Sequence, residues 1–499
     1  MSDYLLNSTI KLNDEELLVD IINIFQKKDL WVNGPFHPKK RLGWLDFEKI
    51  INFSQENSET ILKKIEFENI IFIGMGGSIQ TGKVLKQLYP NNNILFLDST
   101  NPLEIQKISD LIENKKNIFI IMSKSGSTIE TNAIMNFFIA QIKKNIKDFG
   151  KYFIAVTDKD TELELFAHKN NFLKIITTPE DIGGRFSSFT SFGSMPYYAL
   201  KGEGLKELNF SIDKIHQKSK SLSGALFNGI ENDKFNKLKI KISENISEMG
   251  TWIEQLIAES SGKDNKGITP VISNLPNSKS IIEIYTYEDN NKKSNSKLLT
   301  IKINEESIFE DMYIWQISTL MLCKKINVFP FDEPDVKNSK LNTLKIIKSK
   351  KNIPSLDIPF TDQNMLEIFN INSDKEILYL NFFTAESKIL KNSLLNFKKY
   401  LKLTKNINCI SSFGPRYLHS IGQIQKGGPK NIWTIFFYNL KEYELFEFKC
   451  EYDEVRNTFN SQLLGDYYAI KEKGIDAYLI NIDSGIINPF DKIMKQIKE

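Results

Sequence analysis

The chain has 499 residues, which is too long for one ordinary hydrophobic core and predicts two or three packed units. Its 41% hydrophobic and 25% charged residues are typical of a globular protein and exclude a disordered or fibrous one. Lysine and arginine together number 65 against 62 acidic residues, and the lysines are scattered among acids and asparagines. Because no basic block is present, nucleic acid is not an expected partner.

The apolar runs and the cysteines argue against a membrane protein, a disulfide framework and a zinc site. The longest apolar runs, such as Ile118 to Met122, are far shorter than the ~20 residues that span a bilayer, and the N-terminus lacks a signal segment. Cys323, Cys409 and Cys450 are widely separated and have no CxxC spacing. We therefore expect a cytoplasmic protein with buried thiols, no metal and no cofactor.

Short apolar runs alternate with longer amphipathic stretches between Ile70 and Ile176, which is the pattern of a doubly wound parallel sheet. In such sheets ligands bind at the carboxyl ends of the strands, here in the loops that begin at Gly74 and Ser123. The expected strands are 70–73, 94–97, 118–122, 152–156 and 173–176, and the expected helices are 79–88, 102–112, 128–142 and 161–168.

The rest of the chain predicts further α/β structure. A second unit begins near Leu238 and contains helices at 243–260 and 309–323, and beyond Lys350 strands and helices alternate again. We expect four segments, which are an N-terminal helical segment (1–55), a first α/β domain (56–200), a second α/β domain (201–350) and a C-terminal α/β part that completes or extends the second domain (351–499).

Two loops at predicted strand ends suit an anionic ligand. Residues 71–78, IFIGMGGS, run from a buried strand into a glycine-rich turn and a helix, where free amides can face an anion. A tight turn that only packs strand against helix explains this pattern too. Residues 123–131, SKSGSTIET, offer more hydroxyl groups than the single one that a helix cap needs, so they favour a phosphate site.

Glu259 and Gln255 lie one helical turn apart, so a carboxylate and an amide can meet one ligand. A solvated surface carboxylate is the alternative, but Ser-Ser-Gly follows directly and places Glu259 at a helix end beside a loop. Arginine is scarce, and Arg185 and Arg416 both occur in glycine-containing loops where a guanidinium can face an oxyanion. A structural ion pair fits these two residues equally well.

Five motifs in order resemble the glucose-6-phosphate isomerase family, which has two sugar-isomerase (SIS-type) doubly wound domains. The C-terminal FGPRYLHSIGQIQKGGP at 413–429 is similar to the isomerase half of fused transaldolase-isomerase proteins. The five motifs are GMGGS at 74–78, SKSGSTIET at 123–131, GGRFS at 183–187, QLIAESSGK at 255–263 and NVFPFDEPDVKNSK at 327–340.

The resemblance implies catalytic roles for three residues. Glu259 is implied as the base that moves a proton between C1 and C2 of the open-chain sugar, Lys340 as a ring-opening group and Arg185 as the group that stabilises the enediolate. The residues implied to bind substrate or phosphate are Gly77, Ser78, Ser123, Lys124, Ser125, Thr128, Thr131, Gly184 and Gln255.

The chain departs from the family pattern at two points. Glu333 stands where a glutamine is usual before Pro334, which places an acid near an anionic substrate. The family's ring-opening histidine is missing from its usual place, because no histidine occurs between His216 and His419. We expect His419 to take this role, within the chain or across a dimer interface, although a residue that only caps or packs its loop is an equal alternative.

These residues predict a cytoplasmic aldose-ketose isomerase that interconverts glucose 6-phosphate and fructose 6-phosphate without cofactor. A base, an anion-stabilising group and a phosphate anchor are the parts that this chemistry needs. Two alternatives stay open, a sugar-phosphate-binding regulator on the same fold and an isomerase that also accepts mannose 6-phosphate. The expected partner is a small sugar phosphate, with no nucleic acid and no membrane, and a homodimer is expected.

Overall fold

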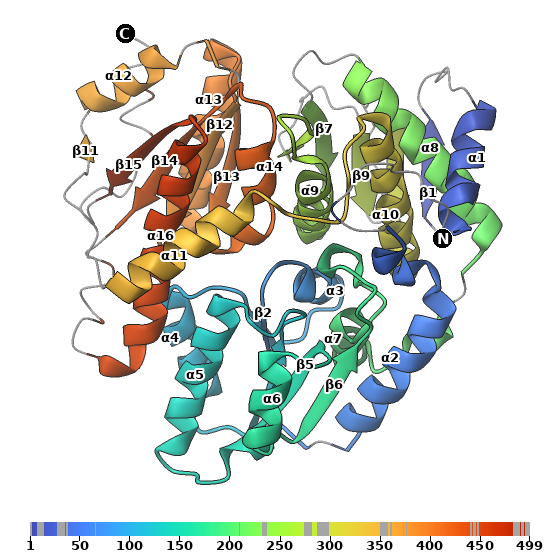
Figure 1. Cartoon of the computed structure of the whole chain (residues 1–499), viewed down its shortest axis with the longest axis vertical. Helices are drawn as coiled ribbons and strands as arrows, with labels where there is room; N and C mark the ends of the chain where they lie inside the picture. The colour runs from blue at the N-terminus through green and yellow to red at the C-terminus, as the bar shows by residue number, and fades with distance from the viewer. Residues whose placement is uncertain are drawn as a thin grey trace.

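In the described residues of the computed structural model, three five-stranded sheets lie in three separate parts of the molecule (Figure 1). Helices cover the sheets, and none of the helices in the described part of the chain is both long and apolar enough to cross a membrane. The structure describes residues 2–6, 14–26, 35, 38–64, 66–208, 210–231, 237–273, 282–286, 299–349, 358–359, 362–372, 374–375, 377–439, 442, 446, 449–482, 490 and 494.

The first sheet has the strand order β3-β2-β4-β5-β6, and all of its neighbours pair in parallel. Its strands are β2 (Asn69–Gly74), β3 (Ile94–Leu97), β4 (Asn117–Met122), β5 (Phe153–Asp158) and β6 (Lys174–Thr178). Its helices are α2 (Phe47–Leu62), α3 (Gln80–Leu88), α4 (Pro102–Ile112), α5 (Ile129–Lys143), α6 (Glu162–Lys169) and α7 (Ser191–Lys201). This arrangement confirms the expected doubly wound α/β fold.

The second sheet has the order β1-β10-β9-β7-β8, in which only β1 runs antiparallel. Its strands are β1 (Asp3–Leu6), β7 (Lys237–Ile242), β8 (Thr269–Ser273), β9 (Ile282–Thr286) and β10 (Leu299–Ile303). The helices beside it are α1 (Asp14–Phe25), α8 (Ile212–Glu231), α9 (Ser247–Ser261) and α10 (Ile308–Lys325). The segment expected to be helical at the N-terminus thus also contributes an edge strand to this sheet.

The strands after residue 351 do not extend the second sheet but form a parallel sheet of their own, β11-β15-β14-β12-β13. Its strands are β11 (Ile358–Pro359), β12 (Ile377–Phe383), β13 (Asn408–Phe413), β14 (Ile432–Tyr438) and β15 (Asp476–Asn481). Its helices are α11 (Val336–Ser349), α12 (Asp362–Ile371), α13 (Lys388–Lys405), α14 (Gly422–Gly427) and α16 (Asp453–Glu472). The expected limits of the units at residues 55, 200 and 350 stay a prediction.

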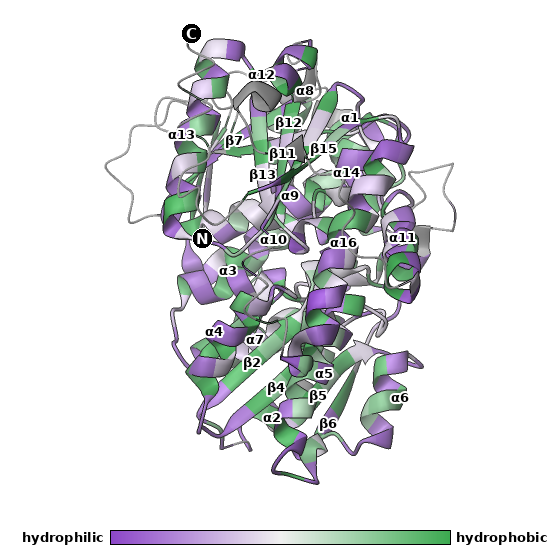
Figure 2. Ribbon diagram, turned by 90° about the vertical axis from the view of Figure 1, so that its left-hand side faces the viewer, coloured by the Kyte–Doolittle hydropathy of each residue, from purple (hydrophilic) through white to green (hydrophobic). Residues whose placement is uncertain are grey.

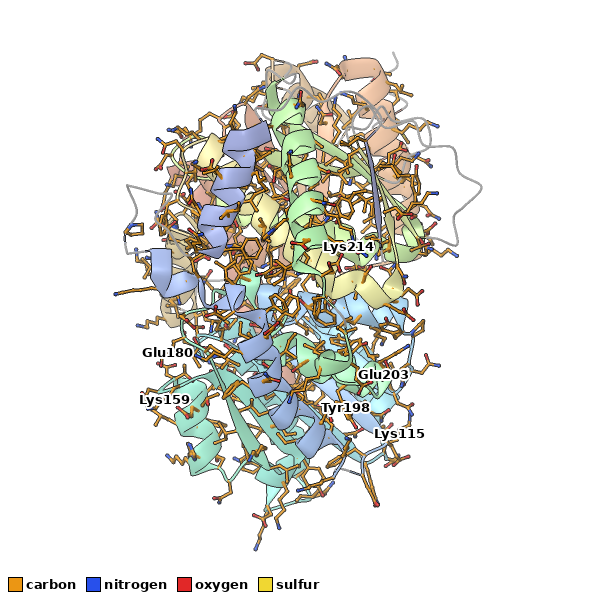
Figure 3. All side chains as sticks on the ribbon, turned by 90° about the vertical axis from the view of Figure 1, so that its right-hand side faces the viewer. Lys115, Lys159, Glu180, Tyr198, Glu203 and Lys214 are labelled. Carbon is orange, nitrogen blue, oxygen red and sulfur yellow. The ribbon has the colours of Figure 1, made fainter. Side chains whose placement is uncertain are left out.

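Hydrophobic residues predominate in the strands of each sheet, and hydrophilic residues dominate the outer faces of the helices (Figure 2). Lysines and glutamates such as Lys115, Lys159 and Glu203 are exposed on the surface together (Figure 3), as expected from the nearly balanced charge. The expectation of buried thiols holds for Cys323 but is wrong for Cys450, which is exposed, and Cys409 is half-buried. The hydrophobic periodicity of the sequence did not indicate that Cys450 is exposed, because Cys450 lies in a short turn before α16.

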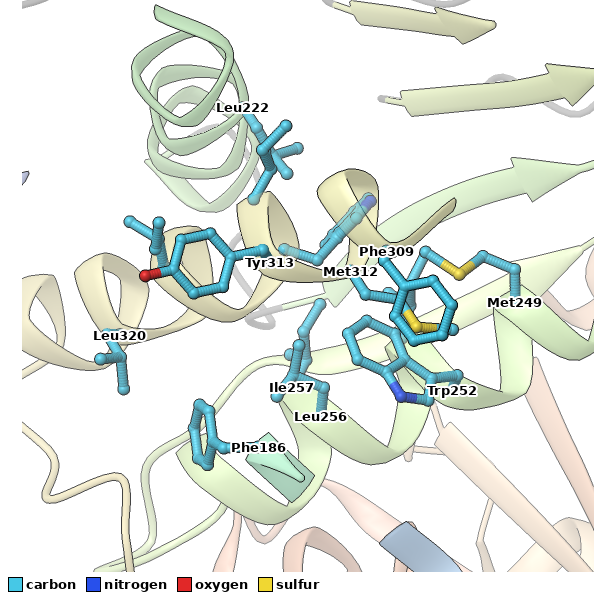
Figure 4. Packing of buried hydrophobic residues seen from close by; sticks show 14 of the residues in the cluster. Phe186, Leu222, Met249, Trp252, Leu256, Ile257, Phe309, Met312, Tyr313 and Leu320 are labelled. Atoms are coloured by element: carbon cyan, nitrogen blue, oxygen red, sulfur yellow. The ribbon is translucent and has the colours of Figure 1, made fainter. Parts of the chain in front are cut away.

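The largest core joins the second sheet's helices to the turn that carries Arg185. Phe186 stacks on Trp44 with ring centroids 5.0 Å apart, and both rings are almost completely buried. Figure 4 shows Phe186 beside Leu256 and Ile257 of α9, within this cluster. Because Phe186 follows Arg185 directly, its burial fixes where the guanidinium can lie.

Candidate active site

The two loops predicted to bind an anion begin side by side at the point where the strand order of the first sheet reverses. After β2 the chain moves to β3 on one side, and then to β4 on the other. Gly74 at the end of β2 is paired with Met122 at the end of β4, so the turn Gly76–Ser78 and the loop from Ser123 leave neighbouring strands. This is the usual ligand position of a doubly wound sheet.

The glycines at 76 and 77 allow three loops to meet. A Cβ on Gly77 would lie 2.3 Å from the carbonyl oxygen of Gly184, so this turn packs backbone to backbone on the GGRFS turn. Gly76 has φ +54°, and a Cβ there would lie 2.9 Å from the Cβ of His419 and 3.0 Å from Nε2 of Gln255. Only glycine allows this close approach, which brings residues far apart in the sequence to one place.

The hydroxyl loop presents its side chains at the start of α5. Ser123 Oγ lies 3.0 Å from Thr128 Oγ1, and Ser125 Oγ lies 3.5 Å from the same atom. Thr128 is the N-cap of α5, but its side chain makes no capping hydrogen bond. Thr131 is fully buried, and its hydroxyl has no hydrogen-bond partner among the described residues. Helix capping therefore does not account for these hydroxyl groups. Their position at the start of α5 favours a phosphate site.

Glu259 lies near the end of α9 with its side chain only 11% exposed. Gln255, one turn earlier, donates from Nε2 to Glu259 Oε2 at 3.1 Å, so the two side chains meet as their spacing predicted. Burial raises the pKa of the Glu259 carboxyl, against the opposing effect of Arg185. A carboxylate with a raised pKa is a better general base near neutral pH.

Arg185 is shared between two carboxylates. Its Nη1 lies 3.3 Å from Glu259 Oε2 and also forms an ion pair with Glu333 Oε1, while Nη2 donates to the carbonyl oxygen of Pro330 at 2.8 Å. Although burial disfavours the charge of Glu333, Arg185 and Lys263 hold the pKa of this carboxyl below its usual value. Glu333 is therefore in direct contact with the predicted enediolate-stabilising group.

His419 comes from a short turn, Arg416–His419, between β13 and α14, and it reaches the first domain. Its Nε2 lies 2.7 Å from Glu130 Oε1 on α5, and Gln462 of α16 donates to the same oxygen. Burial opposes ionisation of Glu130, but His419 lowers the pKa of this carboxyl to about 2. An ionised carboxylate can only accept, so Nε2 carries a hydrogen and Nδ1 is the nitrogen that can exchange a proton with a ligand.

A cavity of about 530 Å³ lies between the first sheet and the C-terminal helices. Ser125 and Thr128 line one side of it, and Lys340 and His419 line the other. A second cavity, of about 300 Å³, is lined by Gly76, Gln255 and His419, among others. His419 thus borders both cavities, whereas Glu259 and Arg185 line neither of them.

Lys124 forms an ion pair in place of a contact with the hydroxyl loop. Its Nζ lies 2.5 Å from Asp158 Oδ1 and donates to the carbonyl oxygen of Pro179 at 2.7 Å. This amine is therefore occupied by the end of β5, which speaks against the role in phosphate binding that the resemblance implied.

Of the two interpretations of Arg416, the structural ion pair is the one present. Its Nη2 lies 2.6 Å from Glu104 and 3.3 Å from Asp98, and its Nη1 forms an ion pair with Glu386. Burial opposes ionisation of Asp98, but Arg416 and Lys83 lower the pKa of this carboxyl to about 2. Three carboxylates surround this guanidinium, so it joins the C-terminal sheet to the first one.

The phosphoglucose isomerase family model matches residues 49–217, which include the glycine turn, the hydroxyl loop and Arg185. Over these residues the chain is similar to the phosphoglucose isomerase family. A glucose-6-phosphate isomerase of Methanocaldococcus jannaschii is 34% identical over 273 residues, which are 50% of this chain and 65% of that protein. One of Campylobacter jejuni is 30% identical over 236 residues, which are 44% of this chain and 58% of that protein.

The chain thus matches less than two thirds of the length of these curated relatives. Among solved structures, a hypothetical protein from Thermus thermophilus superimposes with a TM-score of 0.54 at 20% identity, over 69% of this chain and 99% of that one. This likeness concerns the fold alone.

Sequence analysis did not identify two polar residues of the candidate site. Glu130 lies inside the SKSGSTIET motif, between two predicted phosphate ligands, and its position next to the hydroxyl loop was a signal that it faces the site. Gln462 lies 332 residues further along the chain, in the middle of a long helix, and no local pattern marks it. Only the docking of α16 on α5 brings the two together.

Proposed function

We propose that this protein is a glucose-6-phosphate isomerase that interconverts glucose 6-phosphate and fructose 6-phosphate through an enediolate. The observation that carries this proposal is the buried Glu259 carboxylate held between the amide of Gln255 and the guanidinium of Arg185. The base and the anion-stabilising group are then neighbours, as proton transfer between C1 and C2 requires. The two curated relatives, both named glucose-6-phosphate isomerase, support the same substrate pair.

In this proposal each group has one task. The hydroxyls of the loop at 123–131 and the amides at the start of α5 anchor the phosphate, which keeps the sugar in place during both half-reactions. Glu259 accepts the proton from C2 and returns it to C1, and Arg185 stabilises the negative charge on the enediolate oxygens. Lys340 and His419 border the same cavity as the hydroxyl loop, where they serve ring opening. A regulator that only binds sugar phosphate needs the hydroxyl loop but not Glu259 beside Arg185.

The partner and location follow from the substrate. A phosphorylated sugar is a charged metabolite, so we place the protein in the cytoplasm, with no nucleic acid or membrane as partner. We also propose a homodimer, which sedimentation velocity of the purified protein tests directly. A single monomeric species at micromolar concentration would contradict the dimer and leave the proposed reaction unaffected.

The test is a coupled assay of purified protein with fructose 6-phosphate, in which glucose 6-phosphate is oxidised by its dehydrogenase. We expect turnover in the wild type, and a loss of at least ~10² to 10⁴ in Glu259→Gln, because an amide cannot accept the C2 proton. Exchange of solvent deuterium into the sugar should disappear with it. If Glu259→Gln stays within about tenfold of wild type, a loss of only ~1.4 kcal/mol, the base is a different group.

Glu254→Gln is the matched control, since it makes the same change five residues earlier on the same helix. The charged group near Glu254 is Lys398, whereas Arg185 pairs with Glu259 and Glu333. This variant should therefore keep activity within a few-fold of wild type. Mannose 6-phosphate as a second substrate decides the open question of specificity. Binding of sugar phosphate without any turnover in the wild type would favour the regulator.

A further inference from the structure

Resting on the proposed isomerase function, we propose that Glu333 is a positioning residue that holds the Arg185 guanidinium away from full pairing with the base Glu259. Two carboxylates and one guanidinium then form a three-membered unit in place of a simple base–arginine pair.

The contacts of the guanidinium are unequal. Arg185 Nη1 forms its closer contact with Glu333, and its contact with Glu259 Oε2 is longer, at 3.3 Å. Nη2 donates to the carbonyl oxygen of Pro330, three residues before Glu333. Both of the closer contacts therefore come from the segment 330–333, which orients the guanidinium. Glu259 contacts only Nη1.

The segment 330–333 is itself held in place. Phe331 packs on Phe186, with ring centroids 5.6 Å apart, so the segments that carry Arg185 and Glu333 share one apolar contact. Lys263 donates to the carbonyl oxygen of Phe329 and lies 3.0 Å from Asp332. A carboxylate on this anchored segment can restrain the guanidinium, because it does not have to be ordered first.

The charged groups around the two carboxylates define what a substitution would do. Arg185, Glu333 and His419 face Glu259, and of these only Glu333 is an acid. Arg185, Lys263 and Lys340 face Glu333. Burial raises the pKa of Glu259, and the nearby charge of Glu333 raises it further, whereas Arg185 lowers it. Removing the charge of Glu333 thus removes a like charge from the base and also frees the guanidinium to pair with it.

Both changes act in the same direction on the base. Glu259 would ionise at lower pH and bind its proton less strongly, so it would be a weaker base in the plateau region. The anionic substrate would at the same time meet one negative charge fewer. Glu333 therefore favours the proton-transfer step at the expense of substrate binding, which predicts opposite effects of its removal on kcat and on affinity.

The experiment is the pH profile of isomerisation in Glu333→Gln and Glu333→Asp. For Glu333→Gln we expect the acid limb of kcat/KM to move to lower pH by about one unit, the plateau kcat to fall several-fold and KM to stay the same or fall. Glu333→Asp keeps the charge and should restore most of the acid limb. An acid limb unchanged in Glu333→Gln, or an equal loss at every pH, would overturn the proposal, because a purely structural residue has that effect.

Asp335→Asn is the matched control, since it removes the same charge two residues after Glu333 but from a carboxylate that pairs with Lys473 and not with Arg185. An equal shift of the acid limb in this control would show a general charge effect and would contradict the positioning role.

A second measurement does not depend on activity. ¹³C-carboxyl glutamate labelling, with the Glu259 signal assigned by its loss in Glu259→Gln, follows the titration of Glu259 in the ligand-free protein. This pKa should fall in Glu333→Gln. If the wild type binds but does not turn over sugar phosphate, the proposed function fails, and the titration still decides whether Glu333 controls Glu259. An unchanged titration overturns the present inference alone.

Discussion

His419 and Glu130 form the one contact in the described site that joins a histidine to a buried acid, at 2.7 Å. Glu130 stays ionised down to about pH 2, so above that pH it can fix the orientation and the tautomer of the imidazole. This contact gives His419 a second feature, besides its position between two cavities, that favours a proton-transfer role over simple packing.

We predict that His419→Ala slows isomerisation of the cyclic substrate but leaves proton exchange on an open-chain analogue largely intact, because ring opening and Glu259-dependent exchange are separate steps. Glu130→Gln should produce a smaller loss of the same kind, since the amide still contacts the ring but, able to donate or accept, no longer fixes which ring nitrogen carries the hydrogen. His168→Ala, an exposed histidine on α6, is the control and should have no effect. Equal losses on both substrates would exclude His419 as the ring-opening group.

Loss of phosphate anchoring and loss of charge stabilisation should have different effects on KM and on kcat. Thr128→Val and Ser125→Ala remove hydroxyls that contact the ground state and the transition state alike, so we expect KM to rise far more than kcat falls. Arg185→Lys keeps the charge but loses the planar fork that reaches two carboxylates, so kcat should fall instead. A steady-state comparison of the three variants measures this; a normal kcat in Arg185→Lys would remove its role with the enediolate.

The prediction of single residues from sequence succeeded where the partner was local. Gln255 and Glu259 are four residues apart on one helix, and helical geometry alone brings them together. Prediction from sequence did not decide between the two interpretations of Arg416, because its three acidic partners come from two distant segments. It also did not identify Gln462 as a neighbour of Glu130. A side chain's partners across a domain boundary depend on docking, which no local spacing records.

At the scale of elements, a buried ion pair joins three helices. Lys426 Nζ of α14 lies 2.5 Å from Asp466 Oδ1 of α16, and both side chains are 0% exposed. Ser339 of α11 and Tyr417 of the His419 turn donate hydrogen bonds to the same carboxylate. Since α11 carries Lys340 and the turn carries His419, this carboxylate fixes two predicted ring-opening groups at once.

We predict that Asp466→Asn lowers the free energy of unfolding by ~3 to 5 kcal/mol, because it leaves the Lys426 ammonium buried without its counter-charge. The double variant Asp466→Asn/Lys426→Met should recover most of this loss, since the Asn oxygen still accepts from one of the two hydroxyls and its Nδ2 can donate to the other. Urea unfolding of the two variants and the wild type provides the comparison. A loss below ~1 kcal/mol in the single variant would mean that Lys426 finds another partner or water.

The elements themselves were predictable to different degrees. In the first sheet the predicted strands agree with the observed ones within two residues at each end, because runs such as Ile118–Met122 are fully buried and lie between turn signals. Strand β1 was missed because it is only four residues long and mostly exposed, and its partner β10 lies about 300 residues away. Strand β8 was missed because Pro270 lies within it and is unusual in a strand interior.

On the scale of the whole molecule, Arg416 joins the first and the C-terminal sheets. Its partners Asp98 and Glu104 belong to the first domain, and Glu386 follows β12. The ion pairs with Arg416 and Lys83 depress the pKa of Asp98 in the folded state against the effect of burial, so the stability that Asp98 contributes is present above its unfolded pKa and is lost as the pH falls toward about 2.

We predict that Arg416→Gln destabilises the protein by a few kcal/mol at pH 7, because three carboxylates then lie together without a cation. The difference from wild type should shrink below about pH 4, where these carboxylates can take up protons. Thermal unfolding at several pH values measures both effects. Lys391→Gln, which removes a more exposed cation paired with Glu386 alone, is the control and should cost ~1 kcal/mol or less. A constant difference at all pH values would contradict an electrostatic cause.

The contributions of the three sheets to one site have a consequence for protein synthesis. Ribosomes complete the hydroxyl loop near residue 123 long before they reach His419, and the partner that orients His419 is Glu130, made 289 residues earlier. A nascent chain can therefore fold its first domain early and still lack the imidazole that completes the site. The candidate site is then completed in one late step, when the C-terminal sheet docks on a hydroxyl loop that is already in place.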